Sequence, residues 1–390
     1  MNRSSTRAAV ILASLLALPA AAADPIKIGV VTPLTGTYAP IGQQVRWGLE
    51  LAVKEVNAGG GLLGRPVELI FEDEEANPAV ATQKAEKLFQ VSKVDFLTGT
   101  VNSGSTLAVS QVAERNDRLI STTVSFSDAI TGDKCSPNAF RVNARAGQQS
   151  AALAEWLAKE KGQGVPVYFL GPDYEMGRNT VAAFKAASEA RGMKNVGEVF
   201  APLGNKDYSP FFGQMRAARP AVLYTSVAGN DTARLFTQLD EYGLRKNLLV
   251  VGASGTVTSQ NMGALGKVAE GYVTGVGYSP EISTPENQKF VAAFRAAYGA
   301  DPDLYGADSY GLVHFYKAAV EKAKSTETAK VREAMRGLKW TTPQGVKEMR
   351  AGDHQAIQDM YAVKVVGGKF EIVSRVPGAA AIGPDTCPRF

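Results

Sequence analysis

Residue patterns for catalysis and metal binding are scarce in this sequence of 390 residues. It contains only two histidines, His314 and His354, and only two cysteines, Cys135 and Cys387. Neither histidine has a cysteine or a second histidine nearby, so we expect no metal site. The sequence also has no Gly-x-x-x-x-Gly-Lys-Ser/Thr phosphate loop and no Gly-x-Ser-x-Gly nucleophile turn. Because no nucleophile, base and orienting group can be assembled, we expect neither an enzyme nor a cofactor.

One glycine pattern formally matches the dinucleotide-binding fingerprint. Gly59, Gly61 and Gly64 have the required spacing. The fingerprint works only between a strand and a helix, where the helix N-terminus meets the pyrophosphate. Here the glycines follow a predicted helix and precede a predicted strand. We therefore interpret them as a helix end and a turn.

Long hydrophobic runs and clusters of one charge are also missing. The formal net charge is +4, and Lys and Arg are scattered among Asp and Glu. This distribution gives no basic patch for a nucleic acid, so no such partner is expected. The main apolar run covers residues 8–18, which is well short of the ~20 residues that span a bilayer.

That short apolar run has the setting of an export signal. Arg3 and Arg7 precede it, and three alanines at 21–23 follow it. A basic start, a short apolar segment and small residues predict a signal peptide at 1–23, cleaved after Ala23. No cysteine follows this point directly, so a lipid anchor is not expected. The mature protein is predicted to be exported, soluble and close to neutral, since its net charge falls to +2 without the two arginines.

The rest of the chain alternates predicted strands and helices. Helical faces recur at 45–56 and at 81–89, and buried strands are predicted at 96–98, 119–122, 165–170, 221–225 and 248–251. Continuous apolar strands separated by helices favour parallel sheets covered on both faces. By contrast, residues 359–365 and 369–375, joined at Gly367-Gly368, predict a late antiparallel hairpin. The predicted fold class is α/β, and the length allows about two domains.

The opening segment carries a family resemblance. It reads as a buried strand at 26–36, an amphipathic helix at 42–56, a glycine-rich turn at 57–64, and a second strand at 65–73 before Asn77-Pro78. This order and these residues resemble the branched-chain amino acid-binding family, the periplasmic receptors of ABC importers.

The resemblance implies two doubly wound Rossmann-like lobes joined by three crossovers. By analogy the crossovers lie near 140–144, 275–280 and 339–345. Lobe 1 would comprise residues 24–142 and 277–341, and lobe 2 residues 143–276 and 342–376. Residues 377–390 would form a C-terminal tail.

A carboxylate site is expected at the edge of lobe 1. A strand ends near Gly99 and a helix begins near Ser105, which leaves the backbone N–H groups of Ser103 and Gly104 without helical partners. Such donors bind anions. Ordinary capping by Ser103 or Ser105 is the alternative. Thr123 and Ser125 end the next strand, and parallel strands end at the same edge. The resemblance gives Ser103, Thr123 and Ser125 the role of holding a ligand carboxylate, and Asn102 lies beside them.

The second lobe departs from the amino acid receptors. Those receptors place an acid beside the ligand ammonium, whereas Ser254 stands at the matching position here. Two family tyrosines are matched by Met176 and Val227. Because a buried ammonium without a counter-charge is costly, this pattern indicates a more apolar pocket. The alternative is a shifted alignment, in which Glu175 or Asp231 supplies the acid.

Several further residues are candidate pocket residues, with a purely structural role as the alternative for each. Tyr174 and Met176 suit contact with a flat ring. Tyr38 lies in the first crevice loop, Tyr305 and Asp308 precede a late helix, and Arg145 lies near the first crossover.

The predicted function is capture of a small carboxylate and its delivery to an inner-membrane ABC permease by a monomeric receptor. A benzoate- or hydroxycinnamate-like aromatic acid is the first ligand class. The first alternative is a receptor for branched-chain amino acids or short amides. The second alternative is an exported enzyme of unknown class. In an oxidising compartment, Cys135 and Cys387 are expected to pair, the alternative being two free thiols.

Overall fold

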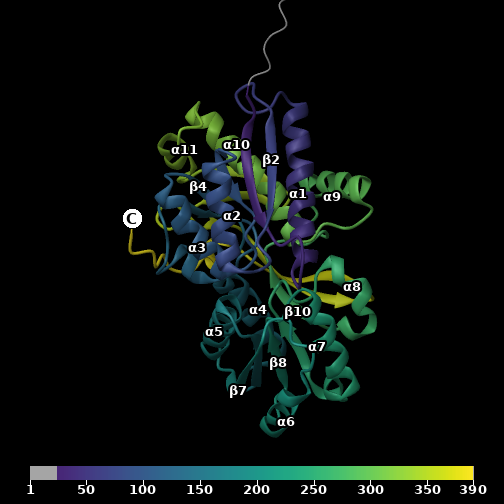
Figure 1. Ribbon diagram of the computed structural model, residues 1–390. Helices are drawn as coiled ribbons and strands as arrows, with labels where there is room; N and C mark the ends of the chain where they lie inside the picture. The colour runs from purple at the N-terminus through teal and green to yellow at the C-terminus, as the bar shows by residue number, and fades with distance from the viewer. Residues whose placement is uncertain (1–23, 390) are drawn as a thin grey trace, which may run out of the picture.

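The computed structural model describes residues 24–389 and consists of two α/β lobes, one above the other (Figure 1). The predicted signal peptide and its cleavage site lie outside the described residues. The first sheet has five parallel strands in the order β2-β1-β3-β4-β5. Its elements are β1 (Ile26–Thr32), α1 (Ala39–Ala58), β2 (Val67–Asp73), α2 (Pro78–Gln90), β3 (Phe96–Thr98), α3 (Ser103–Arg115), β4 (Leu119–Thr122), a 3-10 helix (Asp128–Thr131) and β5 (Ala139–Arg141).

The second sheet has seven strands in the order β15-β14-β10-β9-β8-β6-β7. Its five strands from β10 to β7 run parallel, and β14 and β15 run antiparallel at one edge. The elements up to β10 are α4 (Ala146–Lys161), β6 (Pro166–Pro172), α5 (Glu175–Glu189), β7 (Lys194–Ala201), α6 (Ser209–Ala218), β8 (Val222–Thr225), α7 (Asn230–Glu241), a 3-10 helix (Leu244–Asn247), β9 (Leu249–Gly252), α8 (Ser259–Leu265), a 3-10 helix (Gly266–Ala269) and β10 (Val273–Val276).

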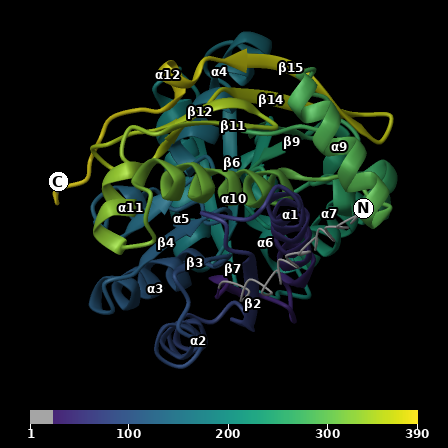
Figure 2. The ribbon, with the colours of Figure 1, turned by 90° about the horizontal axis from the view of Figure 1, so that it is seen from above.

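After β10 the chain returns to the first lobe before it completes the second sheet. The remaining elements are α9 (Pro285–Tyr298), α10 (Leu304–Ala323), α11 (Thr328–Met335), β11 (Lys339–Thr342), β12 (Gly345–Met349), β13 (Ala356–Ile357), β14 (Met360–Val366), β15 (Lys369–Val376) and α12 (Gly378–Ala381). Helix α10 packs against α1 and covers the first sheet (Figure 2). The two doubly wound lobes and the parallel sheets are confirmed.

Local sequence explains why these elements form. On α1, the predicted apolar face at Val45, Leu49 and Val56 is buried, since these positions recur at helical spacing. The predicted late hairpin is β14 and β15, and its turn residues Gly367 and Gly368 both have positive φ, +58° and +76°. Glycine adopts this left-handed conformation without a steric penalty.

The third passage between the lobes can be proposed from the pairing of the last strands. Strands β11, β12 and β13 form a small antiparallel sheet that contacts α10. Just before β13, the His354 carbonyl accepts from the Arg141 N–H of β5 at 2.9 Å. The chain joins the second sheet only at Met360. We therefore propose a third crossing at Gln358-Asp359, in place of residues 339–345, with the small sheet assigned to lobe 1.

Candidate functional site between the lobes

The predicted hydroxyl groups of lobe 1 lie together at one edge of the first sheet. Ser103 begins α3, and Thr123 and Ser125 follow β4. Strands β3 and β4 are paired and parallel, with Leu97 opposite Ile120, so their carboxyl ends lie side by side. All three side chains are buried. The edge faces lobe 2 (Figure 1).

The three hydroxyls differ in what they leave available to a ligand. Ser103 Oγ accepts the Ser127 N–H at 3.3 Å, and Thr123 Oγ1 accepts the Ser309 hydroxyl at 3.0 Å. Each of these two therefore keeps its own O–H as a donor. Ser125 Oγ is 3.0 Å from the Thr100 carbonyl and also contacts Thr106 Oγ1. Ser103 and Thr123 are thus better placed to donate to a carboxylate than Ser125 is.

Asn102 caps helix α3. Its Oδ1 accepts from the Gly104 N–H at 2.8 Å and from the Ser105 N–H at 3.4 Å. Its amide nitrogen donates to the Ala76 carbonyl at 2.8 Å. The Gly104 N–H is therefore engaged by the chain itself. Capping occurs here, as the alternative interpretation held, but Asn102 performs it and neither Ser103 nor Ser105 does.

Glu74 is a buried residue at this edge that the sequence interpretation missed. An acidic run such as 72–75 is typical of a solvated strand end, yet Glu74 is 0% exposed. Its Oε1 accepts from the Val101 N–H at 2.7 Å and the Asn102 N–H at 3.4 Å. Burial raises the pKa of Glu74 to about 7. The sequence feature that could have identified Glu74 is its position directly after β2, at the same sheet edge as the end of β3.

Direct hydrogen bonds join the two lobes in this structure. The hydroxyls of Tyr38, in lobe 1, and Tyr174, in lobe 2, are 2.7 Å apart. Burial raises the pKa of both phenols. Ser127 Oγ donates to Glu175 Oε1 at 2.9 Å. Two more bonds run from the Asp128 N–H to Asn179 Oδ1 at 2.8 Å and from the Asn230 N–H to the Thr37 carbonyl at 3.2 Å. The lobes are therefore closed on one another.

Aromatic and apolar side chains from both lobes fill the space behind these bonds. Met176 of lobe 2 belongs to the same buried cluster as Tyr38, Phe126 and Tyr305 of lobe 1. The rings of Phe126 and Tyr305 stack with centroids 6.2 Å apart. A Cβ on Gly255, next to Ser254, would lie only 2.1 Å from the Tyr305 hydroxyl. The lobes therefore meet at an aromatic surface that a side chain at position 255 would separate.

Two predicted residues of lobe 2 have partners inside that lobe. Val227 belongs to the lobe 2 core with Tyr168 and Leu223. Ser254 Oγ donates to Gln149 Oε1 at 3.0 Å. Both side chains are buried. Among residues 24–389, these contacts hold both side chains within lobe 2 and away from the lobe 1 hydroxyls.

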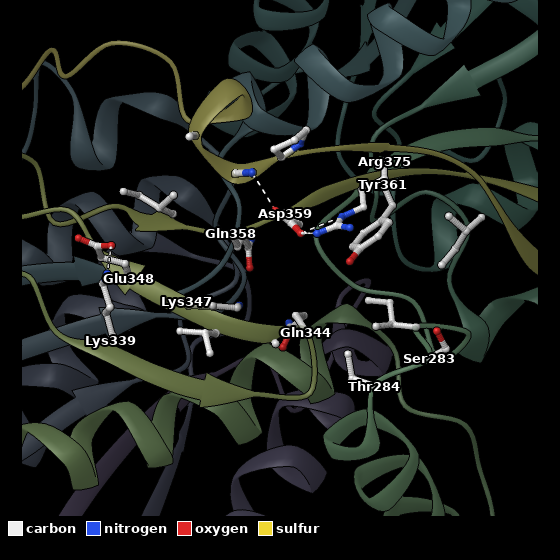
Figure 3. A pocket seen from close by; sticks show the side chains of 18 of the residues that line it. Ser283, Thr284, Lys339, Gln344, Lys347, Glu348, Gln358, Asp359, Tyr361 and Arg375 are labelled. Carbon is white, nitrogen blue, oxygen red and sulfur yellow. Dashed lines mark hydrogen bonds and ion pairs between the residues drawn. The ribbon is translucent and has the colours of Figure 1, made fainter.

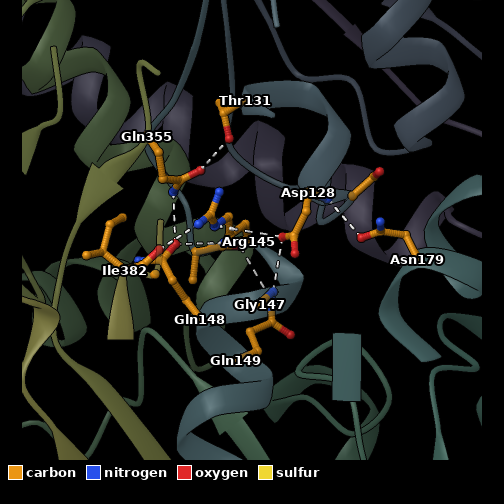
Figure 4. A network of polar contacts seen from close by, with 12 residues as sticks. Asp128, Thr131, Arg145, Gly147, Gln148, Gln149, Asn179, Gln355 and Ile382 are labelled. Atoms are coloured by element: carbon orange, nitrogen blue, oxygen red, sulfur yellow. Dashed lines mark hydrogen bonds and ion pairs between the residues drawn. The ribbon is translucent and has the colours of Figure 1, made fainter. Parts of the chain in front are cut away.

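Arg145 and Asp308 are engaged in structural contacts. Arg145 donates to the carbonyls of Ile382 and Pro384 at 2.7 and 2.9 Å (Figure 4). Asp308 forms an ion pair with Lys347 at 2.6 Å, and both side chains are almost fully buried. These contacts join crossing segments and the C-terminal tail to the lobes. They correspond to the structural alternative for both residues.

The two acids that could replace the missing family acid are also engaged. Asp231 accepts the Gly204 N–H at 2.7 Å and forms an ion pair with Arg234 at 2.5 Å. Glu175 accepts the Ser127 hydroxyl. Asp231 already has a cationic partner, whereas the partner of Glu175 among residues 24–389 is a neutral hydroxyl at the lobe interface.

A large groove lies elsewhere, on the hinge face of the molecule. It has a volume of about 700 Å³ and runs between the small sheet and strands β14 and β15. Gln344 and Lys347 lie on one side, and Gln358, Tyr361 and Arg375 on the other (Figure 3). None of the predicted ligand-binding residues lines it. We therefore locate the candidate site between the lobes and treat this groove as part of the hinge.

The disulfide between Cys135 and Cys387 is present, as predicted from the oxidising compartment. Among residues 24–389, no group of three His, Cys, Asp or Glu side chains is arranged to hold a metal ion. In the same part of the chain, no helix combines the length and hydropathy of a membrane span.

The family model for periplasmic binding proteins matches residues 25–369. The chain belongs to the periplasmic binding protein family. A Leu/Ile/Val-binding protein of Rhizobium johnstonii is 30% identical over 325 residues, which cover 83% of this chain and 86% of the relative. This family supplies the solute-binding proteins of ABC transporters, and its members are receptors and not enzymes. The family also implies a periplasmic location.

Two similar solved structures have bound aromatic acids. A solute-binding protein of an ABC transporter from R. palustris in complex with benzoate is 26% identical, with a TM-score of 0.84 over 90% of this chain and 97% of the other. A solute-binding protein from Rhodopseudomonas palustris BisB5 in complex with 3,4-dihydroxybenzoic acid is also 26% identical, with a TM-score of 0.84 over 91% and 98%. The predicted aromatic branch of the family is supported by these neighbours.

Proposed function

We propose that this periplasmic binding protein captures an aromatic carboxylate, such as a benzoate or hydroxycinnamate, between its lobes. The proposal is carried by Tyr38, Phe126, Tyr305 and Met176, which belong to one buried hydrophobic cluster with members from both lobes, and by the hydroxyl donors Ser103 and Thr123 at the lobe 1 sheet edge. Aromatic and thioether side chains suit the faces and edges of a flat ring. The benzoate-bound neighbours support the same ligand class.

In the proposed binding mode, the two ends of the ligand contact different kinds of side chains. Ser103 and Thr123 would donate to the carboxylate, because each keeps an O–H hydrogen for a further acceptor. The ring would lie against Phe126, Tyr305 and Met176. A polar group at one end and an apolar body fit the usual design of small-molecule sites.

Binding would shift the protein toward the closed arrangement. The Tyr38–Tyr174 and Ser127–Glu175 bonds exist only while the lobes are together. A ligand that contacts both lobes stabilises this state in proportion to its differential affinity for the closed and open forms. The closed form would then be recognised by an inner-membrane permease. We propose that the receptor acts as a monomer, which analytical ultracentrifugation of the mature chain would test.

A thermal-shift screen tests the ligand class. The panel contains benzoate, 4-hydroxybenzoate, hydroxycinnamates, aliphatic keto acids, leucine, valine and short amides. A ligand at a hundred times its Kd adds about 2.7 kcal/mol to the free energy of unfolding. We expect stabilisation by the aromatic acids alone, and loss of that stabilisation in Ser103→Ala. Stabilisation by leucine or valine alone would reject the aromatic ligand.

The second candidate is a receptor for branched-chain amino acids. Glu175 favours it, because this acid lies at the lobe interface and its hydrogen-bond partner among the described residues is the neutral Ser127 hydroxyl. If an ammonium binds there, Glu175→Ala abolishes amino acid binding, while Asp231→Ala serves as the comparison at the other candidate acid. If neither substitution changes amino acid binding, this candidate is excluded.

A further inference from the structure

The chain makes a further connection between the lobes after β15. Residues 377–389, which we name the C-terminal strap, leave lobe 2 and run to lobe 1 (Figure 1). At its start, α12 packs on α4. Arg145, at the N-terminus of α4, then holds the carbonyls of Ile382 and Pro384 (Figure 4). The beginning of the strap is therefore attached to lobe 2. Arg350 of lobe 1, which lies between β12 and β13, also donates to the carbonyls of Gly383 and Pro384, at 2.8 and 3.3 Å.

The end of the strap is attached to lobe 1. Cys387 is bonded to Cys135, which lies between the first 3-10 helix and β5. Arg389 forms an ion pair with Glu114, near the end of α3, at 2.6 Å. The side chains of Arg389 and Glu114 are 45% and 34% exposed. The ion pair therefore adds little to the strength of this attachment. The covalent bond is the main attachment.

We propose that the strap is a tether that limits how far the lobes can separate. Only five residues lead from Ile382 to Cys387, and five residues span at most about 18 Å when fully extended. The other three connections carry no covalent cross-link among the described residues. A tether of fixed length between the lobes restricts the open form, and it would leave the closed form unchanged.

A purely stabilising disulfide is the competing explanation. A cross-link between residues 252 positions apart restricts the unfolded chain and stabilises the fold whatever its effect on lobe motion. The two explanations differ in their dependence on strap length. A longer strap with the disulfide intact keeps the cross-link but slackens the tether.

The test measures lobe separation in ligand-free protein with paired spin labels. Val91→Cys in lobe 1 and Tyr242→Cys in lobe 2 are suitable positions, because their side chains are 73% and 46% exposed. Three proteins are compared by double electron–electron resonance. They are the labelled parent, the labelled Cys135→Ser/Cys387→Ser variant, and the labelled parent with Gly-Ser-Gly-Ser inserted after Asp385.

The tether predicts that both altered proteins show longer and broader label distances than the parent, although the insertion keeps its disulfide. Distances equal to those of the parent in the insertion variant would overturn the proposal, whatever the cysteine variant shows. Thermal melting confirms that each protein is folded. The inference rests on the proposed lobe motion, but the measurement needs no ligand. A failure of the aromatic ligand class would appear in the thermal-shift screen and leave these distances unaffected.

Discussion

The buried ion pair between Asp308 and Lys347 allows a quantitative test of how the hinge region is held together. Its side chains are 3% and 1% exposed. Lys347 Nζ is 2.6 Å from Asp308 Oδ1 and donates to the Val142 carbonyl at 2.9 Å. Gln344 Nε2 also donates to Asp308 Oδ1, at 2.8 Å. The pair thus ties the small sheet both to α10 and to the first crossing.

Two opposing energies of similar size determine how a substitution changes stability. They are the attraction between the two charges and the cost of removing them from water. At 2.6 Å and an effective dielectric constant of 20, the attraction between the two charges is about 6 kcal/mol. Removing each charge from water costs several kcal/mol. Burial accordingly raises the pKa of Asp308 and lowers the pKa of Lys347. The intact pair therefore contributes little net stability, but either charge without the other is strongly unfavourable.

We expect Lys347→Met to lower the free energy of unfolding by about 3–5 kcal/mol, because Asp308 is left charged and buried. The double variant Lys347→Met/Asp308→Leu should lose much less, since it removes both charges. The measurement is equilibrium urea unfolding followed by circular dichroism. Lys339→Met is the matched control in the same sheet, because the Lys339–Glu348 pair is 66% and 42% exposed and should change stability by less than ~1 kcal/mol. A loss below ~1 kcal/mol for Lys347→Met, or equal losses in the single and double variants, would refute the reasoning.

Three other substitutions test the candidate site. Tyr38→Phe leaves the Tyr174 hydroxyl buried without its 2.7 Å partner, so ligand affinity measured by calorimetry should fall about five- to a hundredfold, with partial recovery in Tyr38→Phe/Tyr174→Phe. Gly255→Ala places a Cβ about where the Tyr305 hydroxyl lies, so it should weaken ligand binding while the ligand-free melting temperature changes little. Burial raises the Glu74 pKa from 4.5 to about 7, so the folded protein holds this proton more tightly than the unfolded chain does. The contribution of Glu74 to the free energy of unfolding therefore falls by up to about 3 kcal/mol as pH rises from 4.5 to 7. Glu74→Gln should remove this part of the pH dependence of urea unfolding.

Much of the architecture could be predicted from short-range patterns. Apolar runs such as β4 and β8 are buried strands, and the Gly367-Gly368 pair forms the turn of the predicted hairpin. These features depend on residues close together in the sequence, which periodicity and turn chemistry describe well. The convergence of Ser103 and Thr123 was also accessible, because parallel strands bring their carboxyl ends to one edge.

Features that depend on distant pairings could not be predicted in the same way. Nothing near Lys347 in the sequence indicates that its partner is Asp308, so the bounds implied by the resemblance place Lys347 in lobe 2, whereas the crossing proposed from the structure places it in lobe 1. The acidic neighbours of Glu74 are typical of a solvated segment, yet the N–H of Val101, in the β3–α3 loop, donates to this buried carboxyl group. Arg145 was a candidate pocket residue, but its guanidinium group donates to the strap carbonyls of Ile382 and Pro384. In each case the deciding partner lies far along the chain.

Ser127 joins the candidate site, the lobe interface and the hinge through three different atoms. Its N–H donates to Ser103 Oγ at 3.3 Å, and its side-chain hydroxyl donates to Glu175 at 2.9 Å. Its carbonyl accepts from Arg141 Nη1 at 2.6 Å, and Arg141 is fully buried and also donates to Gln355 Oε1 at 2.6 Å. A shift of Ser103 toward a bound carboxylate would therefore change the position of Ser127. It would thereby affect both the contact to lobe 2 and the first and third crossings. Since packed elements of this kind move as units and do not deform continuously, we propose that this residue would link ligand contact to lobe closure.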